Sequence, residues 1–133
     1  MLDYFFVRTN SEYIRMNFDE VLYIKGRKNY TQFVTEKRNY LILGTIKNIE
    51  SLLPNSRFCR VHKSYVVPLA RIKKFDREMI LLIGKNEKDP DIIIPIGRVY
   101  SNELMKRLVL IPQLGKMNSN LTKSVRWLMQ EAI

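Results

Sequence analysis

The chain has 133 residues, which is enough for one domain with its own hydrophobic core and short for two. Its apolar and charged fractions, 46% and 27%, are those of a folded protein and exclude wholesale disorder. There are 23 lysine and arginine residues against 13 aspartate and glutamate residues, a formal net charge of +10. Such a charge indicates a polyanionic partner, either nucleic acid or an acidic membrane, and we favour nucleic acid over solubility as its explanation.

Membrane insertion and export are not expected. No apolar run approaches the roughly 18 to 20 residues that cross a bilayer, and residues 1–8 lack the basic start and long apolar stretch of a signal peptide. The single cysteine, Cys59, agrees with a reducing compartment. We therefore expect a cytoplasmic protein.

The first forty residues consist of short segments rich in β-branched and aromatic side chains, separated by polar turns. The segments are residues 4–9, 12–17, 21–25, 30–36 and 40–43. Segments of this kind, bounded by Asn, Gly and Ser, indicate antiparallel strands joined by tight turns. We expect a β-meander here.

The hydrophobic period then changes to that of a helix. Apolar side chains recur at positions 46, 49, 52 and 53, Thr45 can act as the N-cap, and Pro54 prevents continuation. Strand signals resume at residues 60–67, 70–76, 78–83 and 91–96, with a polar loop at 84–90. Pro95 indicates an edge strand or a strand end, because proline has no N–H for the ladder.

The C-terminal part reads as helix, loop and helix. Residues 98–110 carry a helical face, so a second helix is expected to close the domain near residue 110. We expect a mainly β domain of antiparallel sheets with one or two short helices over residues 1–110. Residues 111–133 are expected to form a loop and a short amphipathic helix, whose apolar stripe more often docks on its own domain than recruits a partner.

Catalytic and metal chemistry finds little support in the sequence. Cys59 and His62 have C-x-x-H spacing, but two ligands do not make a zinc site and no second cluster supplies the rest. His62 is the only histidine, no serine lies in a G-x-S-x-G motif, and the five glycines form no phosphate-binding motif. Neighbouring cations could activate the Cys59 thiol, yet a small buried hydrophobe is the favoured interpretation. We expect no enzymatic activity, no cofactor and no metal.

Basic and polar side chains gather where predicted strands end, at residues 25–30, 60–64 and 96–101. Arg and Lys can donate to guanine, Asn can pair with adenine, and Ser, Tyr or His can hold phosphate oxygens. Arg98 opposes the dipole of the helix that it begins, and a locally unfavourable residue indicates a functional constraint. The alternative is that Arg98 covers Tyr100 or pairs with a distant carboxylate.

Several motifs in order resemble the LytTR family of bacterial DNA-binding domains over residues 4–109. They are "VLYIKGRKNYTQFVT", "LGTIKNIESLLPNSRFCRVHKSYVV" and "IPIGRVYSNEL". The resemblance implies an elongated, mainly β fold whose loops enter the major grooves of double-stranded DNA at repeated half-sites, with a dimer on the DNA. A response-regulator role is implied as well, with a receiver domain or a sensor kinase as partner in trans. The chain is expected to be either a stand-alone regulator or a domain cut from a longer one.

The resemblance also implies roles for particular residues. Base contacts are expected from Asn29, Tyr30, Lys63 and Arg98. Phosphate contacts, or a part in shaping the loops, are expected from Arg27, Lys28, Arg60, His62 and Ser64.

This chain departs from the family pattern at three positions. Lys25 stands where the family has Glu, Pro68 where Asn is common, and Lys63 where Arg is common. Because lysine lacks the bidentate fork of arginine, base reading at position 63 is expected to be less discriminating.

Two alternatives remain open at this point. A single-stranded nucleic-acid binder would use Tyr30, Phe33 and Tyr65 as stacking platforms. A protein-interaction or membrane-surface module would use the apolar stripe of residues 121–133 and the positive field.

Overall fold

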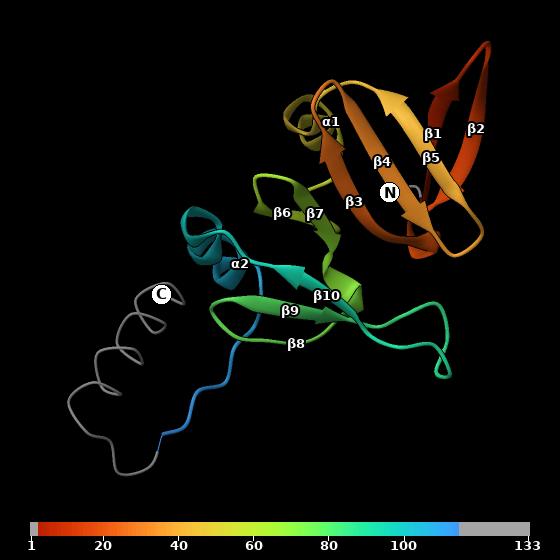
Figure 1. Cartoon of the computed structure of the whole chain (residues 1–133). Helices are drawn as coiled ribbons and strands as arrows, with labels where there is room; N and C mark the ends of the chain where they lie inside the picture. The colour runs from red at the N-terminus through yellow and green to blue at the C-terminus, as the bar shows by residue number, and fades with distance from the viewer. Residues whose placement is uncertain (1–2, 115–133) are drawn as a thin grey trace. The chain divides into compact units, whose positions relative to one another are not determined.

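The structure is a computed structural model and describes residues 3–114 (Figure 1). Within that range the chain forms a two-stranded, a five-stranded and a three-stranded sheet, all antiparallel, and two short α-helices. The mainly β class predicted from the sequence is confirmed.

The elements follow one another closely along the chain. The strands are β1 (Tyr4–Thr9), β2 (Glu12–Asn17), β3 (Val21–Arg27), β4 (Tyr30–Thr35), β5 (Asn39–Leu43), β6 (Phe58–His62), β7 (Tyr65–Pro68), β8 (Ile72–Phe75), β9 (Met79–Leu82) and β10 (Ile92–Pro95). The α-helices are α1 (Ile46–Leu52) and α2 (Ser101–Lys106), and single 3-10 turns lie at Phe18–Glu20, Leu69–Arg71 and Arg98–Tyr100.

The expected meander of the first forty residues is correct only in part. Strands β3, β4 and β5 are consecutive neighbours in the five-stranded sheet, whose order is β5-β4-β3-β7-β6. Strands β1 and β2 instead pair with each other in a hairpin of their own. The three-stranded sheet has the order β10-β9-β8, so β10 is an edge strand and its last residue is Pro95, as expected.

The strand signal over residues 60–67 corresponds to two strands, and the strand end expected within residues 60–64 is confirmed at His62. Those residues form a hairpin in which His62 pairs with Tyr65, leaving Lys63 and Ser64 as a two-residue turn, here called the 63–64 turn. A similar hairpin joins β3 to β4, where Arg27 pairs with Tyr30 around the 28–29 turn. Helix α2 is also shorter than expected, since it ends at Lys106.

Helix α1 has the boundaries that its local sequence predicts. The Thr45 hydroxyl accepts a hydrogen bond from the Asn48 N–H at 3.3 Å, which satisfies one of the unpaired donors of the first turn. The helix ends at Leu52, two residues before Pro54. Its first residue, Ile46, is buried.

One hydrophobic core joins the β1–β2 hairpin, helix α1 and the five-stranded sheet. Its buried members are Val7, Met16, Phe18, Val21, Ile24, Phe33, Ile46, Phe58 and Val66. The rings of Phe5 and Phe18 stack with centroids 5.1 Å apart. Burial of each large side chain contributes about 1.5–3 kcal/mol to the free energy of unfolding. The core therefore holds in place the strands from which the loops extend.

Arg71 connects the three-stranded sheet to segments that flank strands β3 and β4 of the five-stranded sheet. Its guanidinium donates to the Ile83 and Gly84 carbonyls at 3.3 and 3.1 Å, near the end of β9. The same group donates to the Asp19 carbonyl at 2.6 Å and forms an ion pair with Glu36, which follows β4. One side chain thus joins segments that are distant in sequence.

The chain divides after Ser101 into two units. In the described part of the second unit, residues 102–114, Arg107 pairs with Glu103 at 3.0 Å across one helical turn. The helix expected within residues 121–133 lies outside the described residues. Within residues 3–114, no helix has the length and apolar character needed to cross a bilayer.

Candidate nucleic-acid interface

The sheet topology brings the 28–29 turn and the 63–64 turn to one end of the five-stranded sheet (Figure 1). Strand β3 ends beside the start of its antiparallel neighbour β7, with Lys25 opposite Tyr65. The two turns are then joined directly, because the Gly26 N–H donates to the Ser64 carbonyl at 2.8 Å.

A third loop lies against the same hairpin. Residues 97–100, here called the closing segment, follow strand β10. The Gly97 N–H donates to the Val61 carbonyl of β6 at 2.8 Å. The three clusters of basic and polar residues predicted from the sequence are therefore brought together by two backbone hydrogen bonds, Gly26 to Ser64 and Gly97 to Val61.

Gly26 and Gly97 allow this close approach of the loops, and neither is among the site residues predicted from the sequence. A Cβ at Gly26 would lie 2.9 Å from Cβ and Cγ2 of Ile46, closer than carbon atoms pack. A Cβ at Gly97 would lie 2.9 Å from the Tyr100 ring and 3.5 Å from the His62 Cα. Their position inside basic clusters at strand ends was the available signal for close backbone approach.

The predicted cations divide into outward and inward groups. Arg27, Lys28, Lys63 and Arg98 are exposed, and their side chains form no hydrogen bond, ion pair or ring contact within residues 3–114. Arg98 begins the 3-10 turn of the closing segment. Within that range the Arg98 guanidinium forms neither a cation–π contact with Tyr100 nor an ion pair with a carboxylate.

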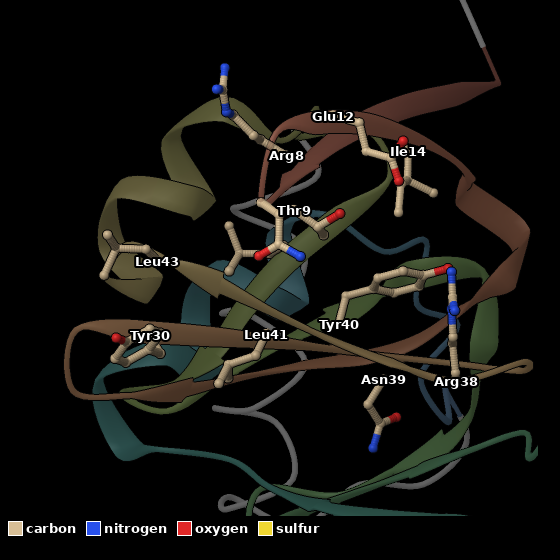
Figure 2. A pocket seen from close by; sticks show the side chains of 12 residues that line it. Arg8, Thr9, Glu12, Ile14, Tyr30, Arg38, Asn39, Tyr40, Leu41 and Leu43 are labelled. Carbon is tan, nitrogen blue, oxygen red and sulfur yellow. The ribbon is translucent and has the colours of Figure 1, made fainter.

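Asn29 and Tyr30 lie at the same end of the sheet, where strand β4 begins. The Asn29 carbonyl accepts a hydrogen bond from the Gly44 N–H at 2.7 Å, which holds the turn while the side chain stays exposed. Tyr30 is 46% exposed and pairs in register with Leu43. It also borders a hollow of about 840 Å³, and Figure 2 shows it there beside Leu41 and Leu43.

The backbone of the 28–29 turn has an unusual conformation. Lys28 has a φ of 56°, in the left-handed region that residues other than Gly and Asn rarely adopt. Lys28 adopts it as the first residue of the two-residue turn between β3 and β4.

His62 and Arg60 contribute hydrogen bonds to the 63–64 turn itself. The His62 Nδ1 accepts from the Ser64 N–H at 3.0 Å, which in the neutral ring leaves the hydrogen on Nε2. The Arg60 guanidinium donates to the His62 carbonyl at 2.9 Å and the Lys63 carbonyl at 2.6 Å. Of the two roles expected for these residues, phosphate contact or loop shaping, this geometry favours shaping for Arg60.

Two further expectations can be compared with the structure. Cys59 is 1% exposed, in agreement with the buried hydrophobe predicted. The three-ring stacking platform is wrong, because Phe33 is 2% exposed and Tyr65 packs against Tyr23 and His62.

Among residues 3–114, no three His, Cys, Asp or Glu side chains are grouped as a metal ion would require.

Comparison with known proteins decides the family. Residues 11–109 match the family described as the LytTr DNA-binding domain. The chain belongs to the LytTR family. DNA is therefore its partner, and the resemblance seen in the sequence motifs is confirmed.

Relatives of this LytTR domain include regulatory proteins. The sensory transduction protein LytT of Bacillus subtilis (strain 168) is 31% identical over 93 residues, covering 67% of this chain and 36% of LytT. The heme-containing CO-sensing transcriptional regulator RcoM 2 of Paraburkholderia xenovorans (strain LB400) is 25% identical over 108 residues, 79% of this chain and 39% of RcoM 2. The chain thus spans less than half the length of these relatives.

A solved structure supports the fold. A LytTr DNA-binding domain from Bacillus cereus superimposes with a TM-score of 0.60 at 22% sequence identity, covering 80% of this chain and 97% of that one. The present chain is a LytTR DNA-binding domain, similar to parts of the sensory transduction protein LytT and of the transcriptional regulator RcoM 2.

Proposed function

We propose that this LytTR domain binds double-stranded DNA sequence-specifically and reads bases in the major groove through three joined loops. One observation carries the proposal: the hydrogen bonds Gly26 to Ser64 and Gly97 to Val61 unite the loops, while Lys63 and Arg98 project from them without partners among the described residues. Major-groove edges present donors and acceptors that distinguish all four base pairs.

Each exposed side chain has a role that fits its chemistry. Lys63 and Arg98 would donate to guanine O6 and N7, and Asn29 would pair with adenine N6 and N7. Tyr30, beside Asn29, would make the flanking base contact. Arg27 and Lys28 would bind phosphates, together with Ser64 and the Nε2 side of His62, and so supply affinity that falls steeply with salt.

We also propose that two copies occupy repeated half-sites. Three short loops reach only a limited stretch of duplex, and pairing of two domains on a repeat multiplies both affinity and selectivity. Signal input would come from a receiver domain or a sensor kinase acting in trans. The names of the relatives, sensory transduction and CO-sensing proteins, agree with a sensory input to such a domain.

The proposal is tested by selecting binding sites from a random duplex pool and then measuring variants on the selected site and on a scrambled duplex. Lys63→Ala and Arg98→Ala should each cost about 1–3 kcal/mol on the selected site and flatten the preference between the two duplexes. Arg27→Ala should weaken both duplexes alike and reduce the salt slope by about one.

Lys85→Ala is the matched control for charge. Lys85 is exposed in the loop between β9 and β10, at the opposite end of β10 from Arg98, so its loss should leave the preference unchanged. Failure of the pool to enrich any motif would contradict sequence-specific binding. Equal losses on both duplexes for all three interface variants would contradict the division into base and phosphate contacts.

Single-stranded binding is tested in the same assay. Two of the three stacking residues are buried or packed, so a single-stranded oligonucleotide should compete poorly with the selected duplex. Stronger competition by the single strand would favour that alternative.

A further inference from the structure

We propose that Arg60 is a positioning residue for DNA reading, which holds the 63–64 turn and the closing segment in a common geometry and does not itself bind DNA. The inference rests on the proposed function, since it assumes that Lys63 and Arg98 read bases. It follows from four contacts of one guanidinium.

The first two contacts hold the turn that carries Lys63. Arg60 Nε donates to the His62 carbonyl at 2.9 Å, and Nη2 donates to the Lys63 carbonyl at 2.6 Å. The strand pairing shifts between Arg60 and His62, so the backbone here leaves its regular ladder. The guanidinium supplies donors to two successive carbonyls at that irregularity, and charge-assisted bonds are the stronger kind.

The third contact joins the turn to helix α1. Arg60 Nη1 lies 3.2 Å from Glu50 Oε1, in the last part of the helix. This carboxylate balances the charge of Arg60 within the protein. Helix α1 is fixed in place because its residue Ile46 is buried in the hydrophobic core. The ion pair with Glu50 therefore holds the 63–64 turn in a defined position relative to this helix.

The fourth contact reaches the closing segment that carries Arg98. The Arg60 Cζ lies 5.5 Å from the centroid of the Tyr100 ring, a cation–π distance. The Tyr100 N–H donates to the Gly97 carbonyl at 2.9 Å, and Gly97 in turn donates to Val61. The segment is thus held on both sides of Arg98, by the ring at one end and by the backbone at the other.

These contacts leave Arg60 little capacity for phosphate. All three guanidinium nitrogens already have acceptors, and its side chain is 13% exposed. Two of its five N–H groups remain, but they lie on a side chain that is nearly buried and beside the Glu50 carboxylate, which repels a phosphate. Lysine could not substitute, because an ammonium point charge lacks the planar fork that reaches three separate acceptors and stacks on a ring.

The test compares Arg60→Lys, which keeps the charge, with Tyr100→Leu, which removes the ring and changes no charge. Affinity for the selected and the scrambled duplex is measured by fluorescence anisotropy at several salt concentrations with the full chain. Both variants should bind the selected site about 5- to 150-fold more weakly, the range for loss of one base reader. The slope of log affinity against log salt should stay as in the unsubstituted protein, because no phosphate contact is lost.

A second readout separates positioning from general loss of structure. In the Lys63→Ala/Arg98→Ala background, Arg60→Lys should add little further loss, since the groups through which it acts are gone. Circular dichroism at the assay temperature checks folding. If the Arg60 variants unfold, Tyr100→Leu alone carries the test.

Two results would overturn the inference. The first is that Arg60→Gln lowers the salt slope by about one and weakens both duplexes equally, as loss of a phosphate contact would. The second is that Tyr100→Leu or Arg60→Lys keeps full selectivity. Failure of the proposed function would look different, because the unsubstituted protein would then select no sequence at all.

Discussion

Replacing Gly26 with alanine tests the close approach of β3 and α1 at the base of the 28–29 turn. The new Cβ would lie 2.9 Å from Cβ and Cγ2 of Ile46, whereas carbon atoms pack best at about 3.5–4.0 Å. Ile46 cannot rotate out of the way, because its Cβ is fixed by the backbone and its branched side chain is stiff at χ1. Either the helix or the strand end must move.

The sign of the effect distinguishes this clash from intrinsic backbone preference. Gly26 has no positive φ, so alanine meets no left-handed strain there. Without a clash, Gly26→Ala would stabilise the protein by about 0.4–1 kcal/mol through the unfolded state. With the clash, overpacking should lower the free energy of unfolding by about 1–3 kcal/mol, measured by urea denaturation with far-UV circular dichroism.

Substitutions at Ile46 provide the internal control. Ile46→Val removes Cδ1 and leaves Cβ and Cγ2, so Gly26→Ala/Ile46→Val should cost the sum of the single variants. Ile46→Ala removes Cγ2 as well and should relieve part of the clash, making the double variant less destabilised than the sum by about 0.5 kcal/mol or more. A Gly26→Ala protein as stable as the unsubstituted chain, or equal relief by Val and Ala, would refute the reasoning.

Three other predictions address the scaffold and the turn. Arg71→Ala should lower the free energy of unfolding, measured in urea, by about 2–4 kcal/mol, because the Glu36 carboxylate and three backbone carbonyls lose their donor. A loss below about 0.5 kcal/mol would contradict the role of Arg71 in joining these segments. The pKa of the Asp76 carboxyl should lie below its usual value, because it accepts backbone hydrogen bonds from Glu78 and Met79. Its stabilising contribution is therefore present above the ordinary Asp pKa and is lost as pH falls through the lowered one; an NMR titration midpoint at or above the ordinary value would contradict this. Lys28→Asn should leave the free energy of unfolding unchanged, since Asn tolerates the positive φ, and should reduce the slope of log affinity against log salt by about one. An unchanged slope would show that Lys28 does not bind a phosphate.

Much of the fold could be predicted because its signals are local. The Thr45 cap and Pro54 set the two ends of α1 through contacts within a few residues. Pro95 similarly identified an edge strand, since the missing N–H is a property of one residue. Alternating apolar residues located most strands for the same reason.

The 63–64 turn could not be predicted in this way. Lys63 and Ser64 include no Gly, Pro or Asn, so only the polar cluster at residues 60–64 indicated a strand end, without a turn type. The turn is held by the guanidinium of Arg60 and by the Gly26 N–H, which is distant in sequence. Such contacts exist only once the sheet has formed.

In the candidate site, too, local signals could be predicted and contacts between distant segments could not. Net charge and the family motifs identified the basic residues, but they did not separate Lys63 and Arg98, which project outward, from Arg60, whose charge is paired inside the protein. That separation depends on the irregular pairing of β6 with β7 and on the position of Glu50 and Tyr100 around the guanidinium. A count of positive charge cannot reveal it.

Methylation interference on the selected duplex tests the central claim of major-groove reading most directly. Guanine N7 lies in the major groove and adenine N3 in the minor groove, so the two methylated positions report the two grooves separately. We predict that N7 methylation at defined guanines in each half-site blocks binding, and that Lys63→Ala and Arg98→Ala each abolish the interference at one of them. Interference confined to adenine N3, or a guanine pattern unchanged in both variants, would contradict the account.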